Sequence, residues 1–173
     1  MTRIAFFVSI GFSVIAWGSL AAQYLWPALR HRSFAEALRP LLVLHSFRFV
    51  GLAFLVPGVV SPDLPSAFAE SAAFGDLVAA TLALLSLMTL RAGAIGVVAA
   101  WIFNLWGTAD LLNAFYQANR TGLVPGQLGA TYFIPTVMVP LLLITHGLAF
   151  RILRQPRSES SESATGGKRR QPA

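Results

Sequence analysis

The chain has 173 residues, of which 55% are hydrophobic and only 12% charged, and it contains no cysteine. A soluble globular domain carries about twice that charged fraction, so the composition excludes an ordinary soluble domain. The lack of cysteine excludes disulfides, thiolate metal sites and thiol catalysis. The net charge of +6 does not indicate nucleic acid, because no recognisable binding module is present and the basic residues stand beside apolar blocks. Anionic lipid headgroups are the expected counter-charge.

Five apolar segments follow one another along the chain, at about 4–26, 40–57, 72–90, 93–114 and 131–150. Each is close to the ~20 residues that a helix needs to cross ~30 Å of hydrocarbon. The alternating apolar and polar pattern of membrane β-barrels is absent from the sequence, so helix is the expected form. The sequence therefore predicts an all-α protein, an integral membrane bundle of five transmembrane helices within 1–154.

The first segment, 4–26, can also be read as a cleaved signal peptide. Arg3 gives it a charged start, and the small residues at 19–21 resemble a cleavage site. Cleavage there would place the Arg-rich loop that follows it outside the cell, against the positive-inside bias. We therefore favour an uncleaved transmembrane helix.

Lys and Arg residues gather in alternate loops. Of the 13, ten lie after the first segment, after the third segment and in the tail, whereas Arg3 and Arg120 are the two in the other flanks. Five crossings with the N-terminus outside and the C-terminus in the cytosol bring every Arg-rich loop into the cytosol. We therefore expect a multi-pass protein of a bacterial inner or plasma membrane, in contact with the lipid bilayer. Residues 155–173 are polar and Ser-rich, which predicts a disordered cytosolic tail.

The second segment contains a charge at depth, Arg48, in the stretch LHSFRFVGL. If the helix spans 40–57, Arg48 lies about 12 Å from its cytosolic end. A charged side chain near the bilayer centre costs about 2.5–3.5 kcal/mol on insertion scales, and an arginine cannot escape this cost by losing its proton. We therefore expect Arg48 to face other helices and to find an acceptor there.

Three residues of the third and fourth segments are candidate acceptors for Arg48. Measured from the cytosolic ends, Asn104 lies at about 18 Å, Asp76 at about 21 Å and Asp110 at about 26 Å. These depths predict that Arg48 meets Asn104 directly, reaches Asp76 with favourable tilt, and reaches Asp110 only through water or another partner. The alternative is that both aspartates are hydrated near the outer interface.

Two histidines, His45 and His146, are both predicted about 6–8 Å from the cytosolic side. Paired imidazoles on two helices could ligate a haem, hold a metal or relay protons. They could equally be satisfied by helix carbonyls, by Ser46 or by Thr145. The cofactor is therefore unknown at this point, with haem as one option.

Six polar residues at depth form the predicted ligand-binding site, and neither catalytic nor metal-ligating residues are assigned. They are Arg48, Asp76, Asn104, Asp110, His45 and His146. Glycines should allow the helices to approach closely; they are Gly51, Gly75, Gly93, Gly96, Gly107 and Gly147.

Three functions are consistent with this pattern. The first is a protein that binds or passes a small lipophilic or anionic ligand, with Arg48 as the anion anchor. The second is an intramembrane enzyme or redox module that uses His45 and His146. The third is a structural or assembly subunit, whose polar residues only lock the helix packing. A homo-oligomer or another membrane protein remains a possible partner, and the sequence does not decide whether the protein is an enzyme.

Overall fold

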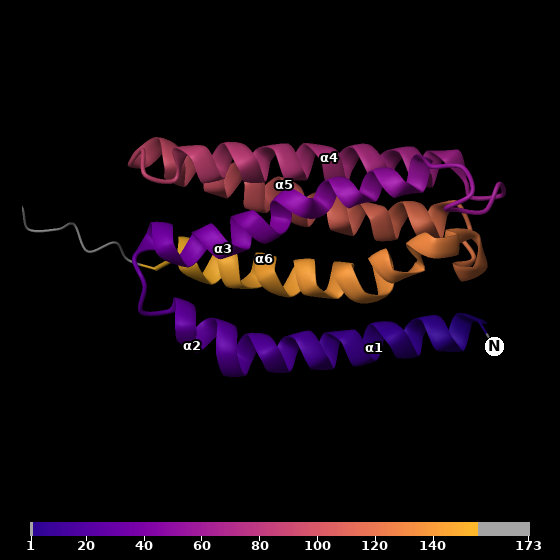
Figure 1. Cartoon of the computed structure of the whole chain (residues 1–173), viewed down its shortest axis with the longest axis horizontal. Helices are drawn as coiled ribbons and strands as arrows, with labels where there is room; N and C mark the ends of the chain where they lie inside the picture. Colours follow the sequence, from indigo (N-terminus) through magenta and orange to yellow (C-terminus); the bar gives the residue numbers. More distant parts are fainter. Residues whose placement is uncertain (1, 156–173) are drawn as a thin grey trace, which may run out of the picture.

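The chain is all-helical in a computed structural model, which describes residues 2–155 (Figure 1). The elements are α1 Thr2–Leu20, η1 Ala21–Leu25, α2 Trp26–Leu29, α3 Phe34–Ser46, η2 Phe47–Leu55, α4 Ser66–Thr89, α5 Ala94–Arg120, η3 Pro125–Tyr132, η4 Ile134–Met138 and α6 Val139–Leu153. No strand forms within residues 2–155. Apart from its first residue, the predicted tail 155–173 lies outside the described residues.

Five helical spans in this part of the chain are long and apolar enough to cross a membrane. They are Arg3–Leu29, Phe34–Leu55, Ser66–Thr89, Ala94–Arg120 and Ile134–Leu153. Their bounds differ most from the predicted ones in three places. The second span begins at Phe34 instead of 40, the third begins at Ser66 instead of 72, and the fourth runs on from 114 to Arg120.

The early start of the second span has a local cause. The Ser33 hydroxyl accepts a hydrogen bond from the backbone N–H of Glu36, and the Glu36 carboxylate accepts one from the Ser33 N–H. This capping box satisfies free N–H groups of the first turn and fixes the helix start. Pro40, the predicted first residue of this span, therefore lies inside α3.

The second half of this span, η2, is a 3₁₀ helix over Phe47–Leu55. A 3₁₀ helix has three residues per turn, so side chains three apart lie above one another. Its buried residues are Arg48, Gly51 and Phe54, at this spacing. The tighter winding therefore turns one row of residues toward α4, the helix on which η2 packs extensively.

The first span is attached to one side of the bundle. In Figure 1, α1 lies apart from the packed group of α3, α4, α5 and α6, and its contacts with other spans are mainly to α6, η4 and η3. Trp17 Nε1 donates to the Val137 carbonyl at 3.1 Å, and the hydroxyls of Ser9 and Tyr132 are 3.3 Å apart. Most side chains of α1 are therefore exposed on the apolar outer surface.

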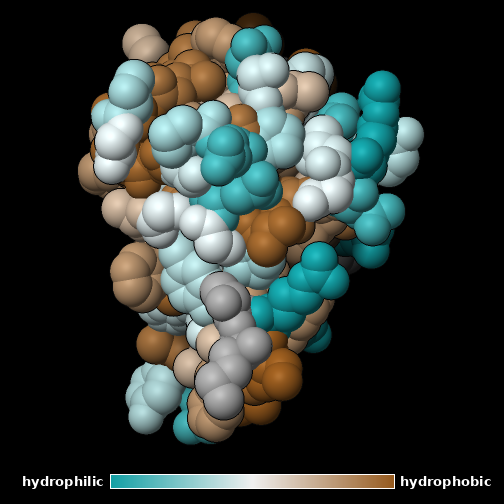
Figure 2. All heavy atoms as spheres, turned by 90° about the vertical axis from the view of Figure 1, so that its right-hand side faces the viewer, coloured by the Kyte–Doolittle hydropathy of each residue, from teal (hydrophilic) through white to brown (hydrophobic). Residues whose placement is uncertain are grey.

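Two apolar clusters lie at opposite ends of the bundle. The closed half, at the end where α2 meets α6, has a core of Ala21, Leu29, Ala37, Leu38, Leu41, Leu42, Ala83, Leu90, Ala100, Phe103, Leu148, Ala149, Ile152 and Leu153. The open half, at the end where α1 begins, has a smaller core of Phe54, Leu64, Phe68, Ala69, Ala72, Ala73 and Leu128. Figure 2 looks onto the end of the open half, where hydrophilic residues are interspersed with hydrophobic ones.

Candidate functional site

A layer of buried polar side chains separates the two halves. This polar layer consists of His45, Arg48, Asp76, Asn104, Asp110, Thr145 and His146. It contains all six residues of the predicted site, and Thr145 in addition. The structure therefore brings the six together from η2 and four α-helices.

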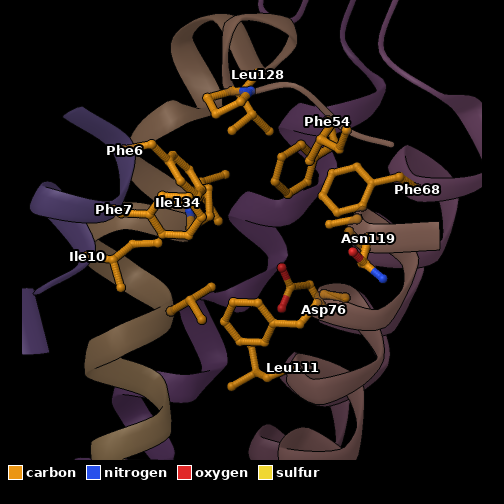
Figure 3. A pocket seen from close by; sticks show the side chains of 18 of the residues that line it. Phe6, Phe7, Ile10, Phe54, Phe68, Asp76, Leu111, Asn119, Leu128 and Ile134 are labelled. Carbon is orange, nitrogen blue, oxygen red and sulfur yellow. The ribbon is translucent and has the colours of Figure 1, made fainter. Parts of the chain in front are cut away.

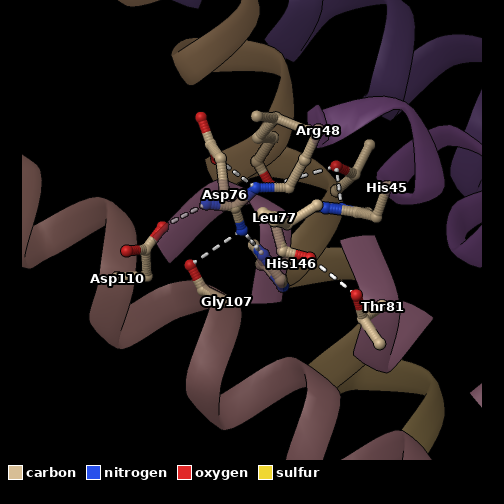
Figure 4. A network of polar contacts seen from close by, with 10 residues as sticks. His45, Arg48, Asp76, Leu77, Thr81, Gly107, Asp110 and His146 are labelled. Atoms are coloured by element: carbon tan, nitrogen blue, oxygen red, sulfur yellow. Dashed lines mark hydrogen bonds and ion pairs between the residues drawn. The ribbon is translucent and has the colours of Figure 1, made fainter. Parts of the chain in front are cut away.

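Arg48 is the centre of the polar layer (Figure 4). Its Nε donates to Asp76 Oδ1 at 2.7 Å, and its Nη2 donates to Asp110 Oδ2 at 2.5 Å. Its Nη1 donates to the Gly107 carbonyl at 3.1 Å and faces His146 Nε2 at 3.5 Å. A guanidinium has five N–H donors, so nearly all of them have acceptors. The side chain is 0% exposed, which leaves no surface of Arg48 for a ligand.

The predicted partner order of Arg48 is wrong. Arg48 binds Asp76 and Asp110 directly, whereas Asn104 is not among its hydrogen-bond partners. The reason is the early start of α3 at Phe34, which puts Arg48 about 21 Å along its span instead of about 12 Å. At this depth it is level with the aspartates. Neither aspartate is merely hydrated near the surface, since both carboxylates are largely buried and paired.

Three glycines make room for the charged side chains. A Cβ on Gly51 would overlap the carboxylate of Asp76, and a Cβ on Gly75 would overlap that of Asp110. A Cβ on Gly107 would lie 2.5 Å from His146 Cε1 and 2.9 Å from Arg48 Nη1. These glycines therefore let carboxylates and a ring approach a helix backbone, which is a more specific role than the predicted close helix packing.

The other three predicted glycines do not serve this role. Gly96 faces the backbone carbonyls of Thr89 and Leu90 at the C-terminal end of α4, while Gly147 has no atom within 4 Å of a built Cβ. Gly93 also has open space, but its φ of +58° is a conformation that favours glycine.

The two histidines are held by hydrogen bonds that define their ring nitrogens. Asn104 Nδ2 donates to the His146 carbonyl at 3.4 Å, so Asn104 Oδ1 accepts from His146 Nδ1–H at 2.7 Å. His146 Nε2 is then the acceptor that faces Arg48. The Thr145 hydroxyl donates to the Leu141 carbonyl, so it accepts from His45 Nε2 at 3.0 Å. Both rings therefore have hydrogen-bond roles that suit neutral imidazole.

The histidine pair does not fit a haem. The ring centroids of His45 and His146 are 4.1 Å apart, and both rings contact Phe103. A haem with two axial imidazoles lies between them, and the direct ring contact leaves no space for a porphyrin. Both nitrogens of His146 also face other partners. Among residues 2–155, no three His, Asp or Glu side chains come together as a metal-ligand group.

A cavity of about 470 Å³ lies in the open half and reaches the polar layer (Figure 3). Its walls are mostly apolar, with Phe6, Phe7 and Ile10 of α1 on one side. Its polar residues include Asp76 and Asp110, whose side chains are 12% and 8% exposed. Arg48, in contrast, does not line it. The charge that the cavity meets at the polar layer is therefore carboxylate, not guanidinium.

Sequence reasoning missed this cavity and its aromatic walls. Phe6, Phe54, Phe68 and Phe115 come from separate helices, and nothing in their spacing links them. The cradling glycines did leave a signal. Gly75 precedes Asp76 directly, and Gly51 and Gly107 stand three residues from Arg48 and Asp110.

Comparison with known proteins identifies a family but no relative of known function. The model of a family described as a domain of unknown function (DUF8737) matches residues 5–154. No curated protein and no solved structure matches the chain.

Proposed function

The chain belongs to the DUF8737 family, and from the geometry of its site we propose that it is an integral membrane protein that binds a small lipophilic molecule. The ligand occupies the cavity of the open half. The observation that carries this proposal is a mostly apolar cavity of about 470 Å³ that reaches a buried polar layer. Ligand pockets of roughly 300–1,000 Å³ typically combine apolar walls with a few polar groups that orient the ligand.

The five spans and the distribution of charge support a membrane location and an orientation. Arg30, Arg32, Arg91, Arg151 and Arg154 all lie at the ends of spans in the closed half. The positive-inside bias then puts the closed half toward the cytosol, with the N-terminus and the open half outside. The bacterial inner membrane is the location that we propose.

This orientation can be tested with single cysteines, since the chain has none of its own. Ala67→Cys lies at the start of α4 and Ala28→Cys at the end of α2, and both residues are exposed. A membrane-impermeant maleimide added to intact cells should label Ala67→Cys and leave Ala28→Cys unlabelled. The reverse pattern would invert the proposed orientation.

The loose attachment of α1 supports access to the cavity from the bilayer. Phe6, Phe7 and Ile10 form the α1 wall, and α1 packs mainly on α6, η4 and η3. A small movement of α1 relative to α4 and α5 would open the cavity sideways to lipid. A lipophilic ligand concentrated in the bilayer would then reach the site without crossing water.

Binding is favoured over passage because the closed half is filled. Leu38, Leu42 and Phe103 are almost completely buried on the far side of the polar layer. The cavity therefore ends at the polar layer instead of continuing to the other end of the bundle. An anionic ligand is disfavoured as well, because the Arg48 side chain is enclosed and its N–H donors already have acceptors.

Native mass spectrometry of the detergent-extracted protein tests the proposal, because it reports ligand and stoichiometry together. Ala114→Phe fills the cavity from α5, whereas Ala109→Phe makes the same change at an exposed position of the same helix outside the cavity. The wild type and Ala109→Phe should carry the same bound small molecule, and Ala114→Phe should lose it. Equal ligand loads in all three proteins, or none in any, would remove the proposal and leave the structural or assembly subunit as the better account.

A further inference from the structure

The polar layer contains more acid than base. Arg48 contributes one positive charge, while Asp76 and Asp110 contribute two negative charges when both are ionised. His146 Nε2 faces the Arg48 guanidinium, and an acceptor nitrogen there requires a neutral ring. His45, whose Nε2 donates to Thr145, has no partner at Nδ1 within the described residues. With the protonation states that these hydrogen bonds imply, the polar layer has one negative charge in excess.

The excess charge lies against the cavity. Both carboxylates line the cavity, while the guanidinium that pairs with them is enclosed behind them. Each carboxylate uses one oxygen for Arg48. The second oxygen lies against the backbone of Gly51 or Gly75 and has no hydrogen-bond partner among residues 2–155. In Figure 3 the Asp76 carboxylate lies among the aromatic side chains that line the cavity. Unpaired buried charge is costly, so a cationic group at this position would be stabilised.

We propose that the ligand of this cavity is a lipophilic amine, whose ammonium group binds the carboxylates of Asp76 and Asp110. This inference rests on the proposed function and names its ligand class. The ammonium binds the side of the two carboxylates that faces the cavity. The apolar body of the amine lies between the α1 wall and Phe54 and Phe68.

The depth of the carboxylates favours a small amine over the amine headgroup of a phospholipid. Asp76 is ten residues from Ser66 and Asp110 is ten residues from Arg120, so both lie about 15 Å from the open end of their helices. A phospholipid in the bilayer keeps its ammonium at the headgroup level, where Arg3 lines the exposed end of the cavity. Only a ligand whose charged end is directed into the protein brings its cation to the aspartates.

A matched series of ligands tests this inference. Decylamine, decanol and decanoate share one tail and differ in the charge of the head. Each is titrated into the wild-type protein in phosphatidylcholine nanodiscs by calorimetry, with empty nanodiscs as the blank for partitioning. The amine should bind about tenfold more tightly than the alcohol, since a charge-assisted hydrogen bond is roughly twice as strong as a neutral one, and decanoate should bind weakest. Replacing part of the phosphatidylcholine by phosphatidylethanolamine should not weaken amine binding if phospholipid ammonium does not compete for the site.

The variant Asp110→Asn removes the excess charge with almost no change of shape and keeps the pair of Arg48 with Asp76. It should lower amine affinity about tenfold and change alcohol affinity less than about twofold. If the variant does not fold, the titrations of the wild-type protein with the three ligands still test the inference. Equal affinity for amine and alcohol would leave the lipophilic site intact but overturn the inference that its ligand is an amine. One of the two aspartates would then be protonated, which would remove the excess charge. Tightest binding of decanoate would also overturn it, whereas no binding of any of the three would count against the cavity as a ligand site.

Discussion

The closed and open halves are built from the same five spans of similar composition, yet one is filled and the other is hollow. In the closed half, Ala21 and Leu29 of the first span are part of the buried core, and the Arg151 guanidinium lies 4.2 Å from the ring centroid of Trp26. In the open half, the first span contributes only the partly buried Phe6 to the core. The way in which the first span is attached at each end therefore decides where a cavity forms.

The largest effect is expected at the boundary between the two halves. Arg48→Met leaves two carboxylates without their guanidinium, and removing one partner of a buried ion pair typically costs about 3–5 kcal/mol of folding free energy. Unfolding by denaturant in mixed micelles measures this loss. Arg39→Met is the matched control, because Arg39 is exposed, and it should change the free energy of unfolding by less than about 0.5 kcal/mol.

A compensating triple variant separates an ion cluster that binds ligand from one that only stabilises the fold. The triple variant Arg48→Met/Asp76→Asn/Asp110→Asn removes the whole ion cluster and should recover most of the lost stability, since it leaves no uncompensated charge in the interior of the bundle. The variant should nevertheless fail to bind ligand. Recovery of stability together with full ligand binding would mean that the cluster only holds the helices together.

Within the closed half, Leu42→Ala should cost about 2–5 kcal/mol, because Leu42 is fully buried and its removal leaves a cavity in a packed core. Ligand affinity, measured on the folded fraction, should stay unchanged, since Leu42 does not line the cavity. A Leu42→Ala protein with wild-type stability would show that the closed half is not tightly packed.

Smaller losses are expected where glycines cradle the carboxylates. Gly75→Ala forces the Asp110 carboxylate to move and should destabilise the fold by about 1–3 kcal/mol. Gly147→Ala has open space at its Cβ and should be neutral, or stabilising by up to about 1 kcal/mol, because alanine favours helix. Equal effects of the two substitutions on thermal unfolding would remove the special role of Gly75.

The smallest effect on stability is expected in the open half. Ile10→Ala trims the α1 wall of the cavity and should change the free energy of unfolding by less than about 0.5 kcal/mol, because Ile10 is only half-buried. Ligand affinity should fall about fivefold, in line with roughly 1 kcal/mol of lost apolar contact. Calorimetry with decylamine measures it, and a loss of stability without a loss of affinity would contradict the assignment of this wall.

The sequence predicts the helices well because apolar length is a local property. The sequence also predicts that Arg48 faces other helices, and it does, because the cost of a charge in lipid follows from the residue type alone. The predicted partner of Arg48 is wrong because the predicted depth depends on where the helix begins. The capping box of Ser33 and Glu36 fixes the helix start before Pro40, so Pro40 lies inside the helix. The ligand-binding role of the six site residues stays a prediction.

The cavity could not be predicted, because it depends on how far apart separate spans stand. Its walls come from α1, η2, α4, α5, η3, η4 and α6, and only tertiary packing sets the distances between these elements. The 3₁₀ winding of η2 could not be predicted either. Arg48, Gly51 and Phe54 stand at the three-residue spacing that places side chains on one face of such a helix.

Thiol labelling tests the contrast between the halves most directly. The natural chain has no cysteine, so Ala114→Cys in the open half and Ala83→Cys in the closed half each provide one reactive group. A small methanethiosulfonate reagent applied to the folded protein in nanodiscs should modify Ala114→Cys, more slowly when decylamine is bound, and should leave Ala83→Cys unmodified. Equal labelling of both, or no labelling of Ala114→Cys, would contradict a cavity confined to one half of the bundle.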